Sequence, residues 1–203
     1  GDAFITGSTT SNNFPATAGA YDVGYNTGID VFVTKLNNTG SGLLYSTYVG
    51  GASDEEGARI VIDVTEAAYV TGNTNSNAFP TVAGSYDLSY NGNTDAFVFK
   101  LNTAGSALAF STFLGGAAGG EYGTGIAINS ANEVFVSGWT GSTDFPVTFC
   151  TYSGSHNGGF DDFFVCKFSA NGGTLLYSTF VGGNNQDYSI PRIALYDPCA
   201  QDV

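Results

Sequence analysis

The sequence predicts an all-β fold built from three copies of one unit of about 65 residues. Three motifs return in the same order: a Phe-Pro pair, a strand-like run that opens with Asp, and an aromatic-Ser-Thr run that closes on Gly-Gly. Self-similarity at a nearly fixed step indicates a repeat protein. The motifs start at Phe14, Phe79 and Phe145, at Asp30, Asp95 and Asp162, and at Tyr45, Phe110 and Tyr177.

Each unit divides into about four short runs rich in β-branched and aromatic residues and bounded by Gly, Asn and Ser. In the second unit these runs cover residues 68–74, 96–101, 107–114 and 125–128. The links that follow the second run are of hairpin length and contain Gly, which predicts antiparallel neighbours. The repeats are residues 1–64, whose first strand is missing, 65–130, and 131–203, whose C-terminal end diverges.

The central runs are apolar on both faces, so both faces of each small sheet should be covered. Four-stranded sheets stacked around an axis, as in a β-propeller, meet this demand. Known propellers have about four to eight blades. With about three, we expect the chain to be part of a larger propeller or assembly, and residues 3–6 to be completed by a strand from the same polypeptide or from a neighbouring copy.

The repeat also resembles a known family. The pattern carried by Tyr69–Gly72, Phe79-Pro80, Asp95–Leu101 and Phe110–Gly116 is similar to the bacterial β-propeller repeat known as the SBBP repeat. The resemblance implies a propeller within a large secreted or cell-surface bacterial protein. It implies no shared catalytic residues.

The charge balance narrows the range of partners. The chain has 18 acidic and 5 basic residues, for a formal net charge of -13, so nucleic acid and anionic membrane surfaces should repel it. No apolar run approaches the roughly 18 residues of a membrane-spanning helix. We therefore expect no nucleic-acid binding and no membrane insertion.

Residues that recur in register should be structural, because a catalytic group is needed once and a structural group once per repeat. We expect the recurring Lys side chains to bond strand ends or pair with carboxylates, and the Phe of each Phe-Pro pair to be a packing residue or part of a binding surface. The recurring residues are Asp30, Asp95 and Asp162, Lys35, Lys100 and Lys167, and Phe14, Phe79 and Phe145.

The acidic run Asp54-Glu55-Glu56 has three interpretations: a solvated turn, a calcium site of carboxylate and carbonyl oxygens, or catalytic carboxyls. Calcium is the one cofactor to consider. A catalytic cluster that breaks the repeat could otherwise occur only around Asp161, Asp162 and His156. We expect His156, the single histidine, to be an exposed turn residue.

Cys150 and Cys166 occur together in the third unit, at positions that hold no cysteine in the first two. Their joint appearance predicts a disulfide and hence an extracellular or cell-surface protein. Because Cys150 replaces Gly19 and Gly84, we also expect this position not to require a positive φ. Cys199 is left without an assigned partner.

The sequence therefore predicts a non-catalytic structural or binding module, a scaffold or adhesin, that presents its loops to a protein or carbohydrate surface. A carbohydrate-active or other hydrolytic propeller enzyme and a subunit of a head-to-tail extracellular filament are the alternatives.

Overall fold

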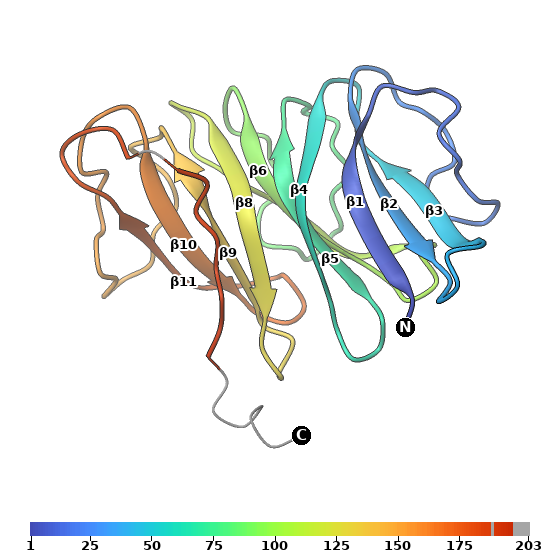
Figure 1. Ribbon diagram of the computed structural model, residues 1–203. Coiled ribbons are helices and arrows are strands. Elements are labelled where there is room, and N and C mark those ends of the chain that lie inside the picture. The colour runs from blue at the N-terminus through green and yellow to red at the C-terminus, as the bar shows by residue number, and fades with distance from the viewer. Residues whose placement is uncertain (188, 197–203) are drawn as a thin grey trace.

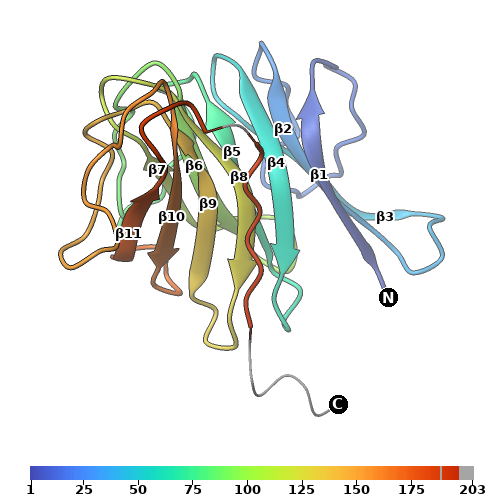
Figure 2. The same ribbon diagram turned by 60° about the vertical axis from the view of Figure 1, so that its left-hand side comes forward.

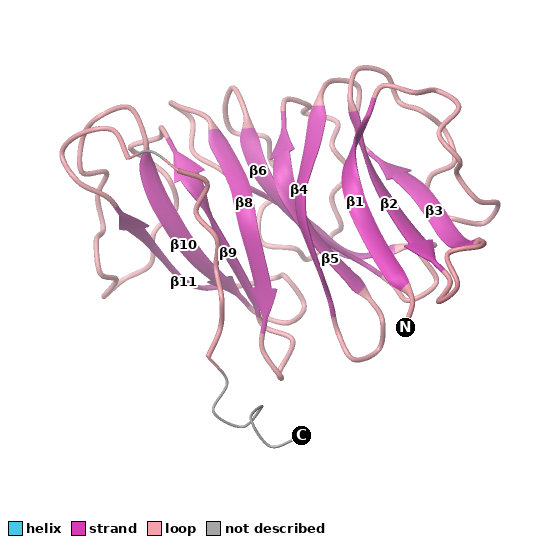
Figure 3. Cartoon of the chain, in the orientation of Figure 1, coloured by secondary structure: helices cyan, strands magenta, loops and turns pink. Residues whose placement is uncertain are grey.

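The computed structural model describes residues 1–187 and 189–196, and this part of the chain contains strands and no helix (Figure 3). The strands form three antiparallel sheets that stand side by side (Figure 1). The all-β prediction is thus confirmed. The first sheet contains β1 (Ala3–Thr9), β2 (Asp30–Leu36) and β3 (Leu43–Val49), the middle sheet β4 (Glu55–Ile62), β5 (Ala68–Thr74), β6 (Asp95–Leu101) and β7 (Leu108–Leu114), and the last sheet β8 (Glu121–Ile128), β9 (Val134–Thr140), β10 (Asp162–Phe168) and β11 (Leu175–Val181).

Within each sheet, strands that follow one another in the chain pair with one another, so each sheet is a simple meander. The middle and last sheets open with the edge strands β4 and β8, whereas the first sheet has no such strand beside β1 among the described residues. The run at residues 125–128, which closes the second sequence unit, belongs to β8 of the next sheet. The sheets therefore begin one strand earlier than the sequence units do.

The hydrophobic core lies between successive sheets. One cluster joins the first and middle sheets and includes Val33, Tyr45 and Phe97, while the other joins the middle and last sheets and includes Phe110 and Phe164. Because the middle sheet contributes to both clusters, both of its faces are covered. This explains why its strands read as continuous apolar runs.

The Phe-Pro loops pack the same way in each repeat. Their rings lie against the second residue after the conserved Asp, with centroid distances of 4.4 Å for Phe14 and Phe32, 4.6 Å for Phe79 and Phe97, and 4.6 Å for Phe145 and Phe164. Aromatic pairs at this separation add specific contacts to the burial of their surface. Phe79 and Phe145 are buried.

The predicted disulfide is wrong. Cys166 lies buried in β10 and its Sγ is 3.0 Å from Ser178 Oγ, whereas Cys150 is exposed in the long loop, and neither forms a disulfide within the described residues. The expectation about the backbone is also wrong, since φ is 83° at Gly19, 90° at Gly84 and 60° at Cys150. All three repeats therefore need a left-handed residue here. Cys199 lies outside the described residues.

The C-terminal segment does not pair with β1. Residues 189–196 form no strand and instead run along β8, where Thr124 Oγ1 donates a hydrogen bond of 2.8 Å to the Pro191 carbonyl (Figure 2). Gly125 leaves room for this contact, because a Cβ there would lie 3.1 Å from Arg192 Cα. No helix in the described ranges could span a membrane.

Candidate binding groove

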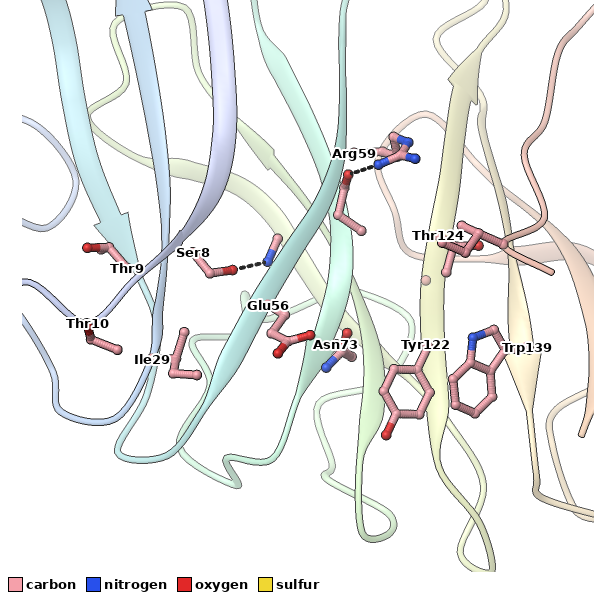
Figure 4. Close-up of a pocket in the computed structure, with 14 residues that line it drawn as sticks. Ser8, Thr9, Thr10, Ile29, Glu56, Arg59, Asn73, Tyr122, Thr124 and Trp139 are labelled. Atoms are coloured by element: carbon pink, nitrogen blue, oxygen red, sulfur yellow. Dashed lines mark hydrogen bonds between the residues drawn. The ribbon is translucent and has the colours of Figure 1, made fainter. Parts of the chain in front are cut away.

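An open groove of about 660 Å³ crosses the side of the molecule where β1, β4 and β8 run next to one another (Figure 4). Ser8 and Thr9 line it from the first sheet, Glu56 and Arg59 from β4, and Tyr122 from β8. All three sheets thus contribute to one surface.

The most distinctive part of the groove is a pair of stacked aromatic rings. Tyr122 on β8 and Trp139 on β9 are directly opposite one another in the register of the two strands, and their ring centroids are 3.8 Å apart at an interplanar angle of 16°. Both side chains are half-buried and reach into the groove (Figure 4). The cross-strand pairing holds the two rings as one rigid platform.

Polar side chains surround this platform. Glu56 and Asn73 are a second cross-strand pair, one sheet away, and Arg59 follows on β4. The Arg59 guanidinium donates to the Ala58 carbonyl at 2.6 Å, and Ser8 Oγ accepts the Gly57 amide at 3.1 Å (Figure 4). The groove therefore combines an apolar platform with hydrogen-bonding groups that include an acidic and a basic side chain. This is the usual composition of a small-molecule site.

The repeats differ from one another at several positions of the groove. Its walls hold different residues at positions that the strand pairing makes equivalent: Ser8, Asn73 and Trp139 share one position, and Glu56 and Tyr122 share a second. The next position along these strands keeps its residue, as Thr9, Thr74 and Thr140. Divergence concentrated on one surface indicates that this surface is specialised.

The recurring Asp side chains lie away from the groove, in the interior. Asp30, Asp95 and Asp162 are fully buried, and each has one carboxylate oxygen without a hydrogen-bond partner among the described residues. A second acid lies beside each of the first two, where Glu55 accepts the Gly51 amide at 2.8 Å and Glu121 accepts the Gly116 amide at 2.9 Å. A side chain at Gly50 or Gly115 would clash with both acids of its pair, so these glycines let the two carboxyls meet.

These buried pairs hold protons more tightly than exposed carboxyls do. Burial, together with the charge of Asp30, raises the pKa of Glu55 to about 7, and burial with the charge of Glu121 raises the pKa of Asp95 to about 6. A proton shared within each pair would satisfy the orphaned Asp oxygen. Because the arrangement recurs in register, we interpret it as structural.

The recurring lysines pair with carboxylates at the opposite ends of the same strands. Lys35 Nζ lies 2.7 Å from Glu66, Lys100 Nζ 3.0 Å from Asp63, and Lys167 Nζ 2.5 Å from Glu133. Each ammonium also stands over an aromatic ring of the adjacent strand, Phe4, Tyr69 or Phe135. None of these lysines lines the groove.

The acidic run does not form one site. Asp54 accepts the Ile29 amide at 3.0 Å, Glu55 is fully buried and bonded to Thr74 Oγ1, and Glu56 faces the groove. Strand alternation explains the separation of Glu55 from Glu56, because successive side chains in β4 point to opposite faces. Among residues 1–187 and 189–196 no group of three His, Cys, Asp or Glu side chains is arranged to hold a metal.

The expectation of an exposed histidine is wrong. The His156 side chain is 7% exposed, its ring packs edge-on against Phe180 with centroids 5.8 Å apart, and its Nδ1 accepts the Gly158 amide at 3.2 Å. Its counterparts Tyr25 and Tyr90 pack against Tyr48 and Phe113 in the same way. His156 is therefore a packing residue, and Asp161 instead contacts Gln186 at the rim of its loop.

Sequence reasoning missed Tyr122 and Trp139, although a signal existed. Trp139 is the single Trp, and it replaces the small polar residue that stands between the recurring Gly and Thr in the other repeats. Comparing the repeats for departures on one face would have found both rings. A scan against protein-family models and a search of curated proteins each found no match for this chain.

Proposed function

We propose that the three sheets are consecutive blades of a β-propeller and that the chain is a non-catalytic module that binds a neutral carbohydrate in the groove. Meander sheets that cover one another in chain order, with the core between them, support the propeller arrangement. A location outside the cell is part of the proposal and is supported by the resemblance to secreted repeats alone.

The observation that carries the binding function is the Tyr122–Trp139 platform. Stacked rings present a flat apolar face of the size of a sugar ring, and Asn73, Glu56 and Arg59 line the same groove with groups that can bond hydroxyls. The net charge of -13 disfavours anionic ligands. A neutral glycan fits these features better than a nucleotide or an acidic peptide.

The fluorescence of Trp139 provides a direct assay, since it is the single Trp of the chain. We expect a neutral oligosaccharide, selected on a glycan array, to shift its emission saturably. Trp139→Ala and Tyr122→Ala should each weaken binding about tenfold or more in calorimetry. Phe149→Ala, at a 96% exposed aromatic residue outside the groove, is the matched control and should bind normally.

The proposal would be overturned if no glycan on the array changed the Trp139 emission, or if a glycan bound with unchanged affinity to a folded Trp139→Ala variant. Turnover of the bound glycan that Glu56→Gln abolishes would instead support the hydrolytic alternative.

A further inference from the structure

The two ends of the row of sheets are uncovered, and they differ from one another. In the first and middle sheets, one face is fully covered by the next sheet, and Tyr45, Phe110 and Leu114 are buried there. The last sheet carries the same residues on the same face, but Tyr177 is 38% and Val181 40% exposed. This face has the composition of a joint between sheets and nothing packed on it within the described ranges.

The opposite end shows the other half of such a joint. Val70 and Val136, on the second strands of the middle and last sheets, are fully buried against the preceding sheet, whereas their counterpart Ile5 on β1 is 43% exposed. Ile5 is exposed because no sheet packs on this face of the first sheet within the described ranges. The last sheet therefore exposes the face on which a following sheet would pack. The first sheet exposes the face that would pack on a preceding sheet.

The loops at the two ends repeat this relation. In both internal joints, a hairpin Gly lies against an aromatic ring of the preceding sheet and accepts a backbone bond from its long loop: Tyr21 N donates to Gly105 O at 2.8 Å, and Tyr86 N to Gly172 O at 2.9 Å. The equivalent Tyr152 is 86% exposed, and a Cβ at the equivalent Gly40 would meet no described atom within 4 Å. Tyr152 and Gly40 therefore each lack the Tyr–Gly contact that their equivalents make in the internal joints.

The segment after β11 also carries the start of a missing edge strand. Asp187 accepts the Gly183 amide at 3.0 Å, as Glu55 accepts Gly51 and Glu121 accepts Gly116 at the entrances to β4 and β8. Ile193-Ala194-Leu195 then repeats the apolar pattern of Ile60-Val61-Ile62. The first sheet lacks the counterpart of β4 on the free edge of β1.

We propose that these two ends are the halves of one joint, made between two copies of this chain. The last sheet of one copy packs on the first sheet of the other, and residues 189–195 leave β8 to pair with β1 of that copy. Two copies bring six sheets together, within the range of about four to eight blades found in propellers. The inference rests on the proposed propeller architecture and not on carbohydrate binding, although Ile190 of the moving segment also lines the groove.

The joint can be tested with the full chain by sedimentation equilibrium at micromolar concentration. We expect twice the chain mass of 20.9 kDa, with tighter association at high salt, because each copy carries a charge of -13. Tyr177→Lys on one end and Ile5→Lys on the other should each give monomers. Val64→Lys, at a 98% exposed valine in the β4–β5 turn, is the control and should leave the dimer intact.

Mixing the two monomeric variants gives the decisive result. One joint in the mixed pair has two unaltered faces, so equimolar Tyr177→Lys and Ile5→Lys should restore a dimer that neither forms alone. A face that pairs with itself would let one of the single variants dimerise, which would overturn the proposal. A monomeric unaltered chain, or growth into long filaments, would overturn it too. Trp139→Ala should remain dimeric, so failure of glycan binding and failure of the joint are distinguishable.

Discussion

At the scale of single residues, the third repeat contains a position in which the side chain and the backbone are in conflict. Cys150 has a φ of 60° at the site where the other repeats place Gly19 and Gly84. A left-handed conformation costs a residue with a Cβ roughly 1–2 kcal/mol, whereas glycine adopts it freely. The thiol is exposed and has no disulfide partner among the described residues to offset this cost.

Cys150→Gly should therefore raise the free energy of unfolding by about 0.5–1 kcal/mol, since the strain relieved exceeds the added entropy of the unfolded chain. Urea unfolding followed by Trp139 fluorescence measures it. Thr151→Gly, one residue on and without a positive φ, is the control and should be destabilising. An unchanged or lower stability of Cys150→Gly would contradict the assignment of strain.

The buried acid pairs predict an unusual pH dependence. The pKa of Glu55, about 7, lies above the value of 4.5 for an ordinary glutamate, so the folded chain binds the proton more tightly than the unfolded chain. This contribution to stability is complete below about pH 4.5 and is lost as pH rises through about 7. The loss should be on the order of 1–2 kcal/mol after allowance for solvent screening.

Glu55→Gln should remove this dependence, because its amide does not titrate and its oxygen can still accept the Gly51 amide. We expect the variant to be more stable than the unaltered chain at about pH 8 and nearly equal to it at about pH 5, in urea titrations at both values. The equivalent change Glu121→Gln should act in the same direction, since burial also raises the pKa of Glu121. A variant less stable at both pH values would contradict the shared-proton interpretation.

At the scale of elements, the hairpins depend on single polar residues that hold their turns. Asp63, after β4, accepts the amides of Thr65 at 2.9 Å and Ala67 at 3.0 Å through one oxygen, and Lys100 and Tyr69 donate to the other. In the last sheet Asn129 accepts the equivalent amides of Ala131 and Glu133. The turn therefore needs an acceptor at this position, and the charge serves the ion pair.

Replacing Asp63 separates these two roles. Asp63→Asn should keep the turn and cost about 1–2 kcal/mol through the lost ion pair, whereas Asp63→Ala should cost about 3–5 kcal/mol because it leaves buried donors and Lys100 without an acceptor. Hydrogen bonding by Thr65 and Lys100 holds the pKa of Asp63 far below its usual range despite burial, so its contribution is lost as pH falls below about 4. Chemical denaturation at neutral and acid pH measures both effects, and equal costs for Asn and Ala would contradict this separation.

At the scale of the whole molecule, stability depends on the two hydrophobic clusters that lie between successive sheets. Phe79 lies in the cluster between the first and middle sheets, and Trp139 lies in the last sheet. If the packing between the first and middle sheets and that between the middle and last sheets unfold together, Phe79→Ala should lower two urea midpoints equally. These are the midpoint measured by Trp139 fluorescence and the midpoint measured by far-ultraviolet circular dichroism. The expected cost is about 3–5 kcal/mol.

Phe145→Ala, its equivalent in the second joint, should behave alike, and Phe149→Ala, at a 96% exposed residue, should have no effect. A Trp139 transition unaffected by Phe79→Ala would show that the sheets unfold separately.

The sequence by itself determined the local features of this protein. The order of apolar and turn residues predicted the strands closely, β5 at residue 68 through 74 among them, because strand formation and hairpin turns depend on neighbouring residues. Recurrence in register likewise predicted a structural role for residues such as Asp95 and Lys100.

Only the tertiary structure decided how distant segments meet. It kept Cys150 and Cys166 apart, buried His156, and brought Tyr122 and Trp139 together with Glu56 from another sheet. The sequence pattern indicates which side chains must be buried, but not which sheet packs against them. That choice depends on contacts between residues far apart in the chain, and both the groove and the two open ends are its results.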